Sequence, residues 1–132
     1  MIGQTKDVGF EIGVSKTLPV PVDEVWALLT SPEGVALWLG RGAELGRTKG
    51  DRYTTADGTT GEIRSFHEHS RLRLTWRPAG WDHDTTVQVT VQAQNDRTVL
   101  RFHQEWLAVP EERARQRDHW RAVMATMVDA LS

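Results

Sequence analysis

Apolar and polar residues alternate in four segments of the chain, which predicts strands with one buried face. The segments cover residues 8–14, 72–76, 87–91 and 99–106. In the last of them Leu100, Phe102, Gln104 and Trp106 are predicted to point inward, with the residues between them facing outward. Alternation this regular is typical of an antiparallel sheet that has one side in water.

Two short helices are predicted between the first strand and the rest of the sheet. The first begins near Val22 or Asp23, and its apolar stripe contains Trp26. Ser31 then caps a second helix with Pro32 in its first turn, which ends at Gly40 and buries Val35 and either Leu37 or Trp38. We expect Trp26 and Trp38 to hold these helices against one end of the sheet.

A long amphipathic helix is predicted at the end of the chain, from Pro110 to Leu131. Its apolar stripe follows the i, i+3, i+4 spacing and contains Trp120, Val123, Met124, Met127, Val128 and Leu131. The helix would be roughly 33 Å long at about 1.5 Å per residue. About seven strands are equally wide, so this helix can lie across the sheet.

One segment breaks the alternation. Ile63 and Phe66 are an odd number of residues apart and cannot share a face of a regular strand, so we expect a β-bulge or an early strand end within residues 61–69.

These elements predict a single α+β domain over residues 1–132. The inner face of the sheet is the only large apolar surface that can bury the stripe of the last helix. A curved sheet around one helix leaves space between them, so the fold tends to contain a pocket.

Length, charge and composition exclude several function classes. A chain of 132 residues suits one domain. Its net charge of −2 disfavours a nucleic-acid partner, which requires surplus positive charge. It has no cysteine, which excludes disulfides and thiol chemistry. No stretch predicts a signal peptide or stable membrane insertion, so a cytoplasmic location is the default expectation.

The chain resembles a known family. The segments that carry the resemblance are VSKTLPVPVDEVWALLTSPEGVALWLG, GEIRSFHEHSRLRLTW, TTVQVTVQ and TVLRFHQEWL, followed by a terminal helix with a central tryptophan, Trp120. Together they are similar to the bacterial relatives of the activator of heat shock protein 90 ATPase, within the START-like, helix-grip superfamily. The resemblance implies an apolar cavity between sheet and long helix, which the superfamily uses for hydrophobic molecules and, in a minority of members, for catalysis.

We predict a ligand site in that cavity. Its candidate lining residues are Trp38, Tyr53, Trp76, Phe102, Gln104, Trp106, Trp120, Met124 and Met127. Gln104 occupies an inward position where an unpartnered amide would cost about 1 to 3 kcal/mol. Its partner is a backbone group, a buried water, a tryptophan N–H or a polar atom of a ligand.

Catalytic and metal chemistry have weaker support. His67 and His69 have a spacing that can chelate zinc, but a zinc site needs at least one more ligand, and no spacing rule connects Asp82, His83 and Asp84 with this pair. We therefore interpret all of them as polar residues at exposed strand ends. No metal or other cofactor is expected. The motifs of hydrolases, metalloproteases and nucleotide-binding proteins are missing. Acid or base chemistry would fall to His119, His67 or Tyr53.

Three functions therefore stay open. The first is binding of a small hydrophobic or amphipathic molecule, and the second is a cyclase or isomerase that uses the same cavity. The third is a protein-interaction domain of co-chaperone type with a filled core, acting through an outer stripe of Arg71, Arg73, Arg77 and Arg101 or an exposed helix edge. This stripe is more simply the solvated side of the sheet, and a homodimer is one assembly to consider.

Overall fold

The computed structural model describes residues 4–5 and 9–131 and has the predicted α+β architecture. Its helices are α1 (Val22–Thr30), α2 (Pro32–Trp38) and α3 (Pro110–Ala130). Its strands are β1 (Gln4–Thr5), β2 (Gly9–Leu18), β3 (Arg52–Thr54), β4 (Thr60–His67), β5 (Arg71–Trp76), β6 (Thr85–Gln94) and β7 (Arg97–Leu107). Val8, which the sequence assigns to the first strand, lies outside the described residues.

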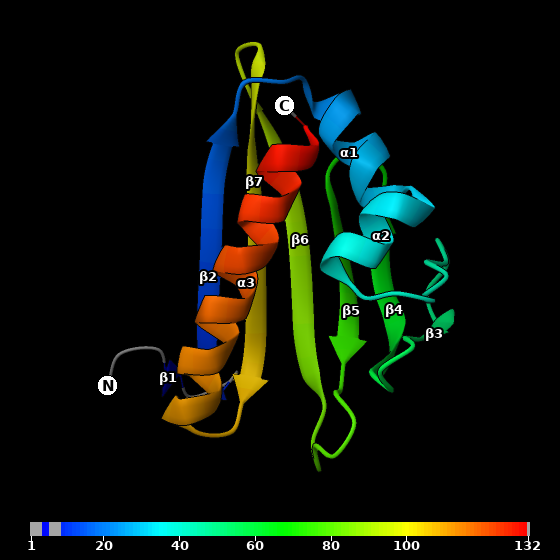
Figure 1. Ribbon diagram of the computed structural model, residues 1–132, viewed down its shortest axis with the longest axis vertical. Helices are drawn as coiled ribbons and strands as arrows, with labels where there is room; N and C mark the ends of the chain where they lie inside the picture. Colours follow the sequence, from blue (N-terminus) through cyan, green and yellow to red (C-terminus); the bar gives the residue numbers. More distant parts are fainter. Residues whose placement is uncertain (1–3, 6–8, 132) are drawn as a thin grey trace.

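The strands form one antiparallel sheet in the order β1-β2-β7-β6-β5-β4-β3. Helices α1 and α2 carry the chain from β2 to the far edge of the sheet, and β3 to β7 then return strand by strand until β7 pairs with β2 (Figure 1). Since β1 has only two residues, six strands form most of the sheet. The expectation of about seven strands is confirmed.

The two short helices begin where the sequence predicts. The Ser31 side chain accepts a hydrogen bond from the Gly34 backbone N–H at 3.0 Å, and Pro32 occupies the first turn of α2. A Cβ on Gly34 would overlap the Leu28 carbonyl, so glycine allows α1 and α2 to meet closely. Trp38 Nε1 donates to the carbonyl of Leu29 at 2.9 Å, which joins the helices from inside.

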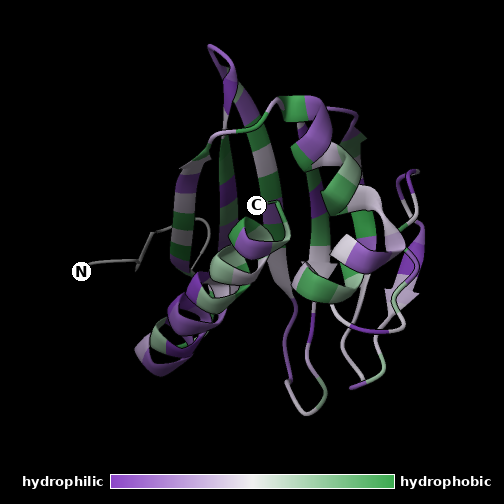
Figure 2. Ribbon diagram, turned by 45° about the horizontal axis from the view of Figure 1, so that its top comes forward, coloured by the Kyte–Doolittle hydropathy of each residue, from purple (hydrophilic) through white to green (hydrophobic). Residues whose placement is uncertain are grey.

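Helix α3 crosses the inner face of the sheet over β2 and β7 and contacts α2, while α1 packs against β6 and β7 (Figure 1). Hydrophobic and hydrophilic residues alternate along the strands, and the helices cover one face of the sheet (Figure 2). Trp120, Val123, Met124 and Met127 are buried along α3, as its apolar stripe predicts. Within residues 4–5 and 9–131, no helix has the length and apolar composition of a membrane span.

The predicted orientation of Trp106 is wrong. Its side chain is 47% exposed and its φ is +68°. The cause is a register shift between β2 and β7, where Phe10 pairs with Leu107 but Ile12 pairs with Gln104. The extra residue of β7 interrupts the alternation after Glu105, which still pairs in register with Thr86. Glu105 is buried on the outer face of the sheet, as its predicted orientation requires, because its carboxylate pairs with Arg73 at 2.9 Å.

The irregularity expected in residues 61–69 is confirmed. The register between β4 and β5 shifts between Ile63 and Ser65. The bulge turns Phe66 toward the helices, where its ring meets that of Trp26 edge-on at 5.5 Å. It therefore fixes the end of the sheet that α1 covers.

Candidate functional site

Eight of the nine predicted lining residues are buried, and Trp106 is the exception. Phe102, Gln104, Trp120 and Met127 have 0% exposure. The Phe102 and Trp120 rings stack at 4.9 Å between centroids with an interplanar angle of 16°. Side chains of the predicted set therefore fill the space between β7 and α3 by packing on one another.

Gln104 is the centre of a buried hydrogen-bond network. Its Oε1 accepts from Trp120 Nε1 at 2.9 Å and from Gln116 Nε2 at 3.0 Å. Its Nε2 donates to Thr85 Oγ1 at 2.9 Å, and Thr85 donates in turn to the carbonyl of Trp76 at 2.6 Å. A tryptophan N–H was one of the predicted partners. The network joins β5, β6, β7 and α3, and explains how a buried amide is tolerated.

The backbone carbonyl of Trp76 is the last acceptor of this network, and the Trp76 ring belongs to a cluster of aromatic rings. Its ring lies 5.8 Å from Trp81, 5.9 Å from His119 and 6.4 Å from Trp120. The Trp76 side chain is 7% exposed, and its buried Nε1 has no hydrogen-bond partner in the part of the chain that is described. Trp81 is half-buried, and His119 is exposed in part while its ring packs against Trp76, so the cluster connects the core with solvent. We call Trp76, Trp81, His119 and Trp120 the aromatic cluster.

His119 belongs to both the core and the surface. Its ring meets Trp120 edge-on at 4.8 Å in addition to its contact with Trp76. Burial of the ring lowers the pKa of His119, and the charge of Asp57 opposes this effect. The imidazole is therefore neutral at pH 7, so the aromatic cluster presents no positive charge of its own.

His83 packs against Trp81 at the border of the aromatic cluster and connects two elements of the fold. His83 lies between β5 and β6, and its ring stacks on Trp81 at 5.1 Å. Its Nδ1 is 2.9 Å from Asp82 Oδ1 and its Nε2 is 3.0 Å from Glu112 Oε1 in the first turn of α3. The hydrogen bond with Asp82, followed by that with Glu112, raises the pKa of His83, although burial opposes them. The bridge thus ties the β5–β6 connection to α3.

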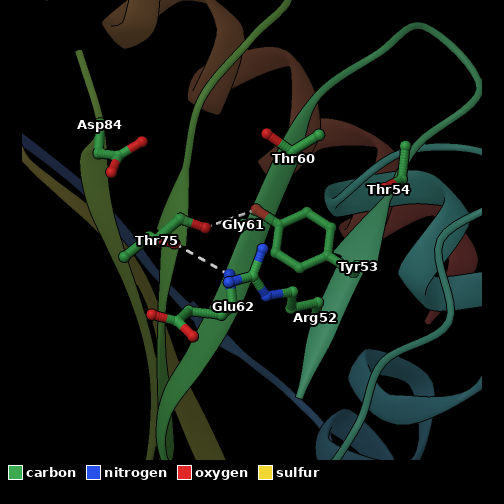
Figure 3. A pocket seen from close by; sticks show the side chains of 8 residues that line it. All are labelled: Arg52, Tyr53, Thr54, Thr60, Gly61, Glu62, Thr75 and Asp84. Carbon is green, nitrogen blue, oxygen red and sulfur yellow. Dashed lines mark hydrogen bonds between the residues drawn. The ribbon is translucent and has the colours of Figure 1, made fainter. Parts of the chain in front are cut away.

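Tyr53 lies away from the aromatic cluster, at a depression of about 260 Å³ near the β3 edge. Figure 3 shows its hydroxyl donating to the carbonyl of Thr75, at 2.6 Å. Burial, together with the charge of Asp84, raises the pKa of Tyr53, so the phenol keeps its proton. Arg52 and Glu62 also line this depression and give it charges of both signs, which does not suit an apolar ligand.

Two other depressions lie on different surfaces. One of about 370 Å³ is lined by Gly13, Thr90, Arg101 and their neighbours on the outer face of the sheet. Another, of about 230 Å³, is lined by Pro32, Val35 and residues 43–45 beside α2. Of the nine predicted lining residues, only Tyr53 lines one of the three depressions.

The remaining polar candidates lie on the surface. His67 is exposed at the end of β4, and His69 is exposed in the turn that follows. Among the described residues, no three acidic, histidine or cysteine side chains are grouped to hold a metal ion. In the outer arginine stripe, Arg73 Nη1 pairs with Glu105 Oε1 at 2.9 Å and donates to Gln88 Oε1 at 3.1 Å. This arginine is therefore committed to partners within the sheet.

Sequence reasoning missed several members of this region. Trp81 and Thr85 lie at a strand connection and a strand start, where no periodic pattern marks them. The contact between His83 and Glu112 joins residues that are 29 positions apart. Gln116 lies one helical turn before Trp120, and this spacing is the one signal that could have placed its side chain beside Gln104.

Comparison with known proteins places the chain in a family. Residues 19–132 match the family described as "Activator of Hsp90 ATPase homolog 1-like protein". The chain belongs to this family. A search of curated proteins found no significant match.

Solved structures agree with membership of the Activator of Hsp90 ATPase homolog 1-like family. DynU16, described as a putative protein in the dynemicin biosynthetic locus, has a TM-score of 0.78 and 25% identity over 92% of this chain. The chain spans only 46% of DynU16. CalU16 from Micromonospora echinospora has a TM-score of 0.80 and 20% identity, covering 93% of this chain and 76% of its own. The Aha1 dimer from Colwellia psychrerythraea has a TM-score of 0.73 and 16% identity, and the match covers 92% of this chain and 95% of its own.

Proposed function

We propose that the chain binds a small, mostly apolar molecule between the sheet and α3, at the aromatic cluster. The observation that carries the proposal is the place of Trp76, whose buried ring is in contact with the half-buried Trp81 and the exposed His119. Ligand sites combine apolar and aromatic walls with a few polar atoms. The aromatic cluster has this composition, and the family fold is consistent with ligand binding.

Binding requires a ring to move, because the cluster is filled. Trp81 is the ring best suited to move, since it is half-buried and belongs to the connection between β5 and β6. Trp120 is not, because its ring is fully buried and its N–H is bound to Gln104. The ligand therefore enters from the side of Trp81 and lies against Trp76.

Native mass spectrometry of the freshly purified protein, followed by binding assays, tests the proposal. We expect an added mass of a few hundred daltons that is lost on denaturation, or, if the protein is free of ligand, micromolar binding of the apolar probe fluorene in equilibrium dialysis. Trp81→Asp places a charge at the entry and should weaken binding by about tenfold or more, whereas Leu37→Asp, on the exposed side of α2, should not change it. Absence of both the adduct and fluorene binding contradicts the proposal.

Self-association is a second candidate function. Trp106 and Val109, at the junction of β7 and α3, are 47% and 43% exposed. A tryptophan with positive φ is uncommon, and such strained residues concentrate at functional sites. The Aha1 protein from Colwellia psychrerythraea is described as a dimer. We expect a dimer in sedimentation equilibrium that Trp106→Asn weakens; a monomer at several hundred micromolar would contradict this candidate.

A further inference from the structure

Three buried side-chain nitrogens have no hydrogen-bond partner among the described residues, and they differ in their surroundings. They are Trp26 Nε1, Trp76 Nε1 and Arg117 Nε. Trp26 is 2% exposed beside Phe66 and His69, neither of which belongs to the network of Gln104. Trp76 is the one that lies in the proposed ligand site. A buried donor without an acceptor is unfavourable, so each such group calls for an explanation.

From this we infer that the molecule bound at the aromatic cluster is flat and conjugated and carries an acceptor oxygen, such as a carbonyl, that receives a hydrogen bond from Trp76 Nε1. The inference rests on the proposed function and adds the chemical class of the ligand.

The polar atoms around Trp76 explain why the ligand must supply an acceptor. The carbonyl of Trp76 already accepts from Thr85, and the Thr85 hydroxyl accepts from Gln104. The Gln104 Oε1 already has two donors, Trp120 and Gln116. Each of these acceptors therefore already has at least one donor, and none of them pairs with Trp76 Nε1. A ligand without an acceptor would leave the N–H unpaired, and a ligand donor would face another donor.

The surrounding rings explain why the ligand is flat. The indole of Trp81 meets Trp76 edge-on, with an interplanar angle of 80°, and the rings of His119 and Trp120 are tilted against it by 34° and 50°. Trp81 itself shows the kind of group that fits against Trp76: a planar fused ring. A conjugated molecule that takes the place of this indole keeps the aromatic contacts that the movement of Trp81 gives up.

A pair of probes of nearly equal shape tests the inference. Fluorene and 9-fluorenone are both flat tricyclic molecules, and only fluorenone has a carbonyl. We expect the wild-type protein to bind fluorenone about tenfold more tightly than fluorene in equilibrium dialysis, because one net hydrogen bond to an unpaired donor has this magnitude. Trp76→Phe keeps a ring but removes the N–H, and should bind the two probes within about twofold of each other.

Trp26→Phe is the matched control, because it removes another unpaired indole N–H at a different end of the core. It should keep the tenfold preference. Circular dichroism tests whether both variants fold, and the wild-type ratio tests the inference even if Trp76→Phe does not fold.

The outcomes separate this inference from the proposed function. If the wild-type protein carries no adduct and binds neither probe, the proposed function and the inference are both contradicted. If it carries an adduct but does not bind fluorenone once the adduct is removed, the inference alone is overturned. If it binds both with equal affinity, or if Trp76→Phe keeps the preference for fluorenone, the inference is overturned while the proposed function stands.

Discussion

Replacing Gln104 by leucine tests whether the buried network holds the sheet to α3. Leucine has a similar size but neither accepts nor donates a hydrogen bond. The substitution removes the two hydrogen bonds that Trp120 and Gln116 donate and the one that Thr85 accepts. The Trp76 carbonyl keeps its bond from Thr85. The substitution therefore leaves two buried donors without their acceptor, Trp120 Nε1 and Gln116 Nε2.

The size of the effect follows from the burial of these donors. An unpaired buried donor costs about 1 to 3 kcal/mol. Trp120 is fully buried and cannot reach water, so it bears the full cost, whereas Gln116 is 7% exposed and can turn outward in part. We expect Gln104→Leu to lower the free energy of unfolding by about 2 to 5 kcal/mol, a large share of the 5 to 15 kcal/mol typical of a domain.

Urea unfolding followed by far-UV circular dichroism measures this change. The control is Gln88→Leu, which removes a half-buried amide from the outer face, where it accepts from Arg73. Its effect should stay below about 1 kcal/mol. Trp120→Phe keeps the stacked ring but removes the donor, so the double variant with Gln104→Leu should lose less stability than the sum of the single variants.

A change below about 0.5 kcal/mol for Gln104→Leu, or strict additivity in the double variant, would refute the reasoning. It would mean that the hydrogen bonds of Gln104 are exchanged for others at no cost. The account of the buried amide would then be wrong, although the fold would be unaffected.

Three further predictions concern the framework of the site. The raised pKa of His83 means that its hydrogen bonds with Asp82 and Glu112 stabilise the fold fully below the unfolded pKa of about 6.5 and lose this contribution as pH rises through the folded pKa. The stability difference between wild type and His83→Gln should therefore shrink from pH 5.5 to pH 9, and a difference that is constant with pH would contradict these two contacts. Gly61→Ala should destabilise the protein by more than about 2 kcal/mol, because a Cβ there would overlap the backbone of β5, and an unchanged melting temperature would contradict the close approach of β4 and β5 at this glycine. Ser31→Ala removes the cap of α2 and should cost about 1 kcal/mol in thermal unfolding, whereas no cost would mean that water replaces the cap.

Periodicity was sufficient for most of the fold, because one-sided burial is visible in any segment whose register stays constant. The stripe of α3 is an example, since Trp120, Val123 and Met127 are buried as their spacing predicts. Trp106 shows the limit. The same alternation placed it inward, but the register shift between β2 and β7 turns it to solvent, and such a shift depends on the partner strand rather than on the local sequence.

The site was less predictable than the fold. Gln104 was identified from sequence because a polar residue stood in an apolar series, and the structure supplies its partners. The unpaired N–H of Trp76 could not be identified, because whether an indole finds an acceptor depends on three other elements of the chain. The bridge between His83 and Glu112 was equally hidden, because it arises only when α3 folds back over the sheet.

The indole N–H signals of a ¹⁵N-labelled sample test the central claim most directly. The chain has six tryptophans, so single Trp→Phe variants can assign each signal. On addition of 9-fluorenone, we predict large shifts for Trp76 and for Trp81, a smaller one for Trp120, and little change for Trp26 and Trp38. Shifts confined to the exposed Trp106, or no shift of the Trp76 signal at saturating probe, would contradict a ligand site at the aromatic cluster.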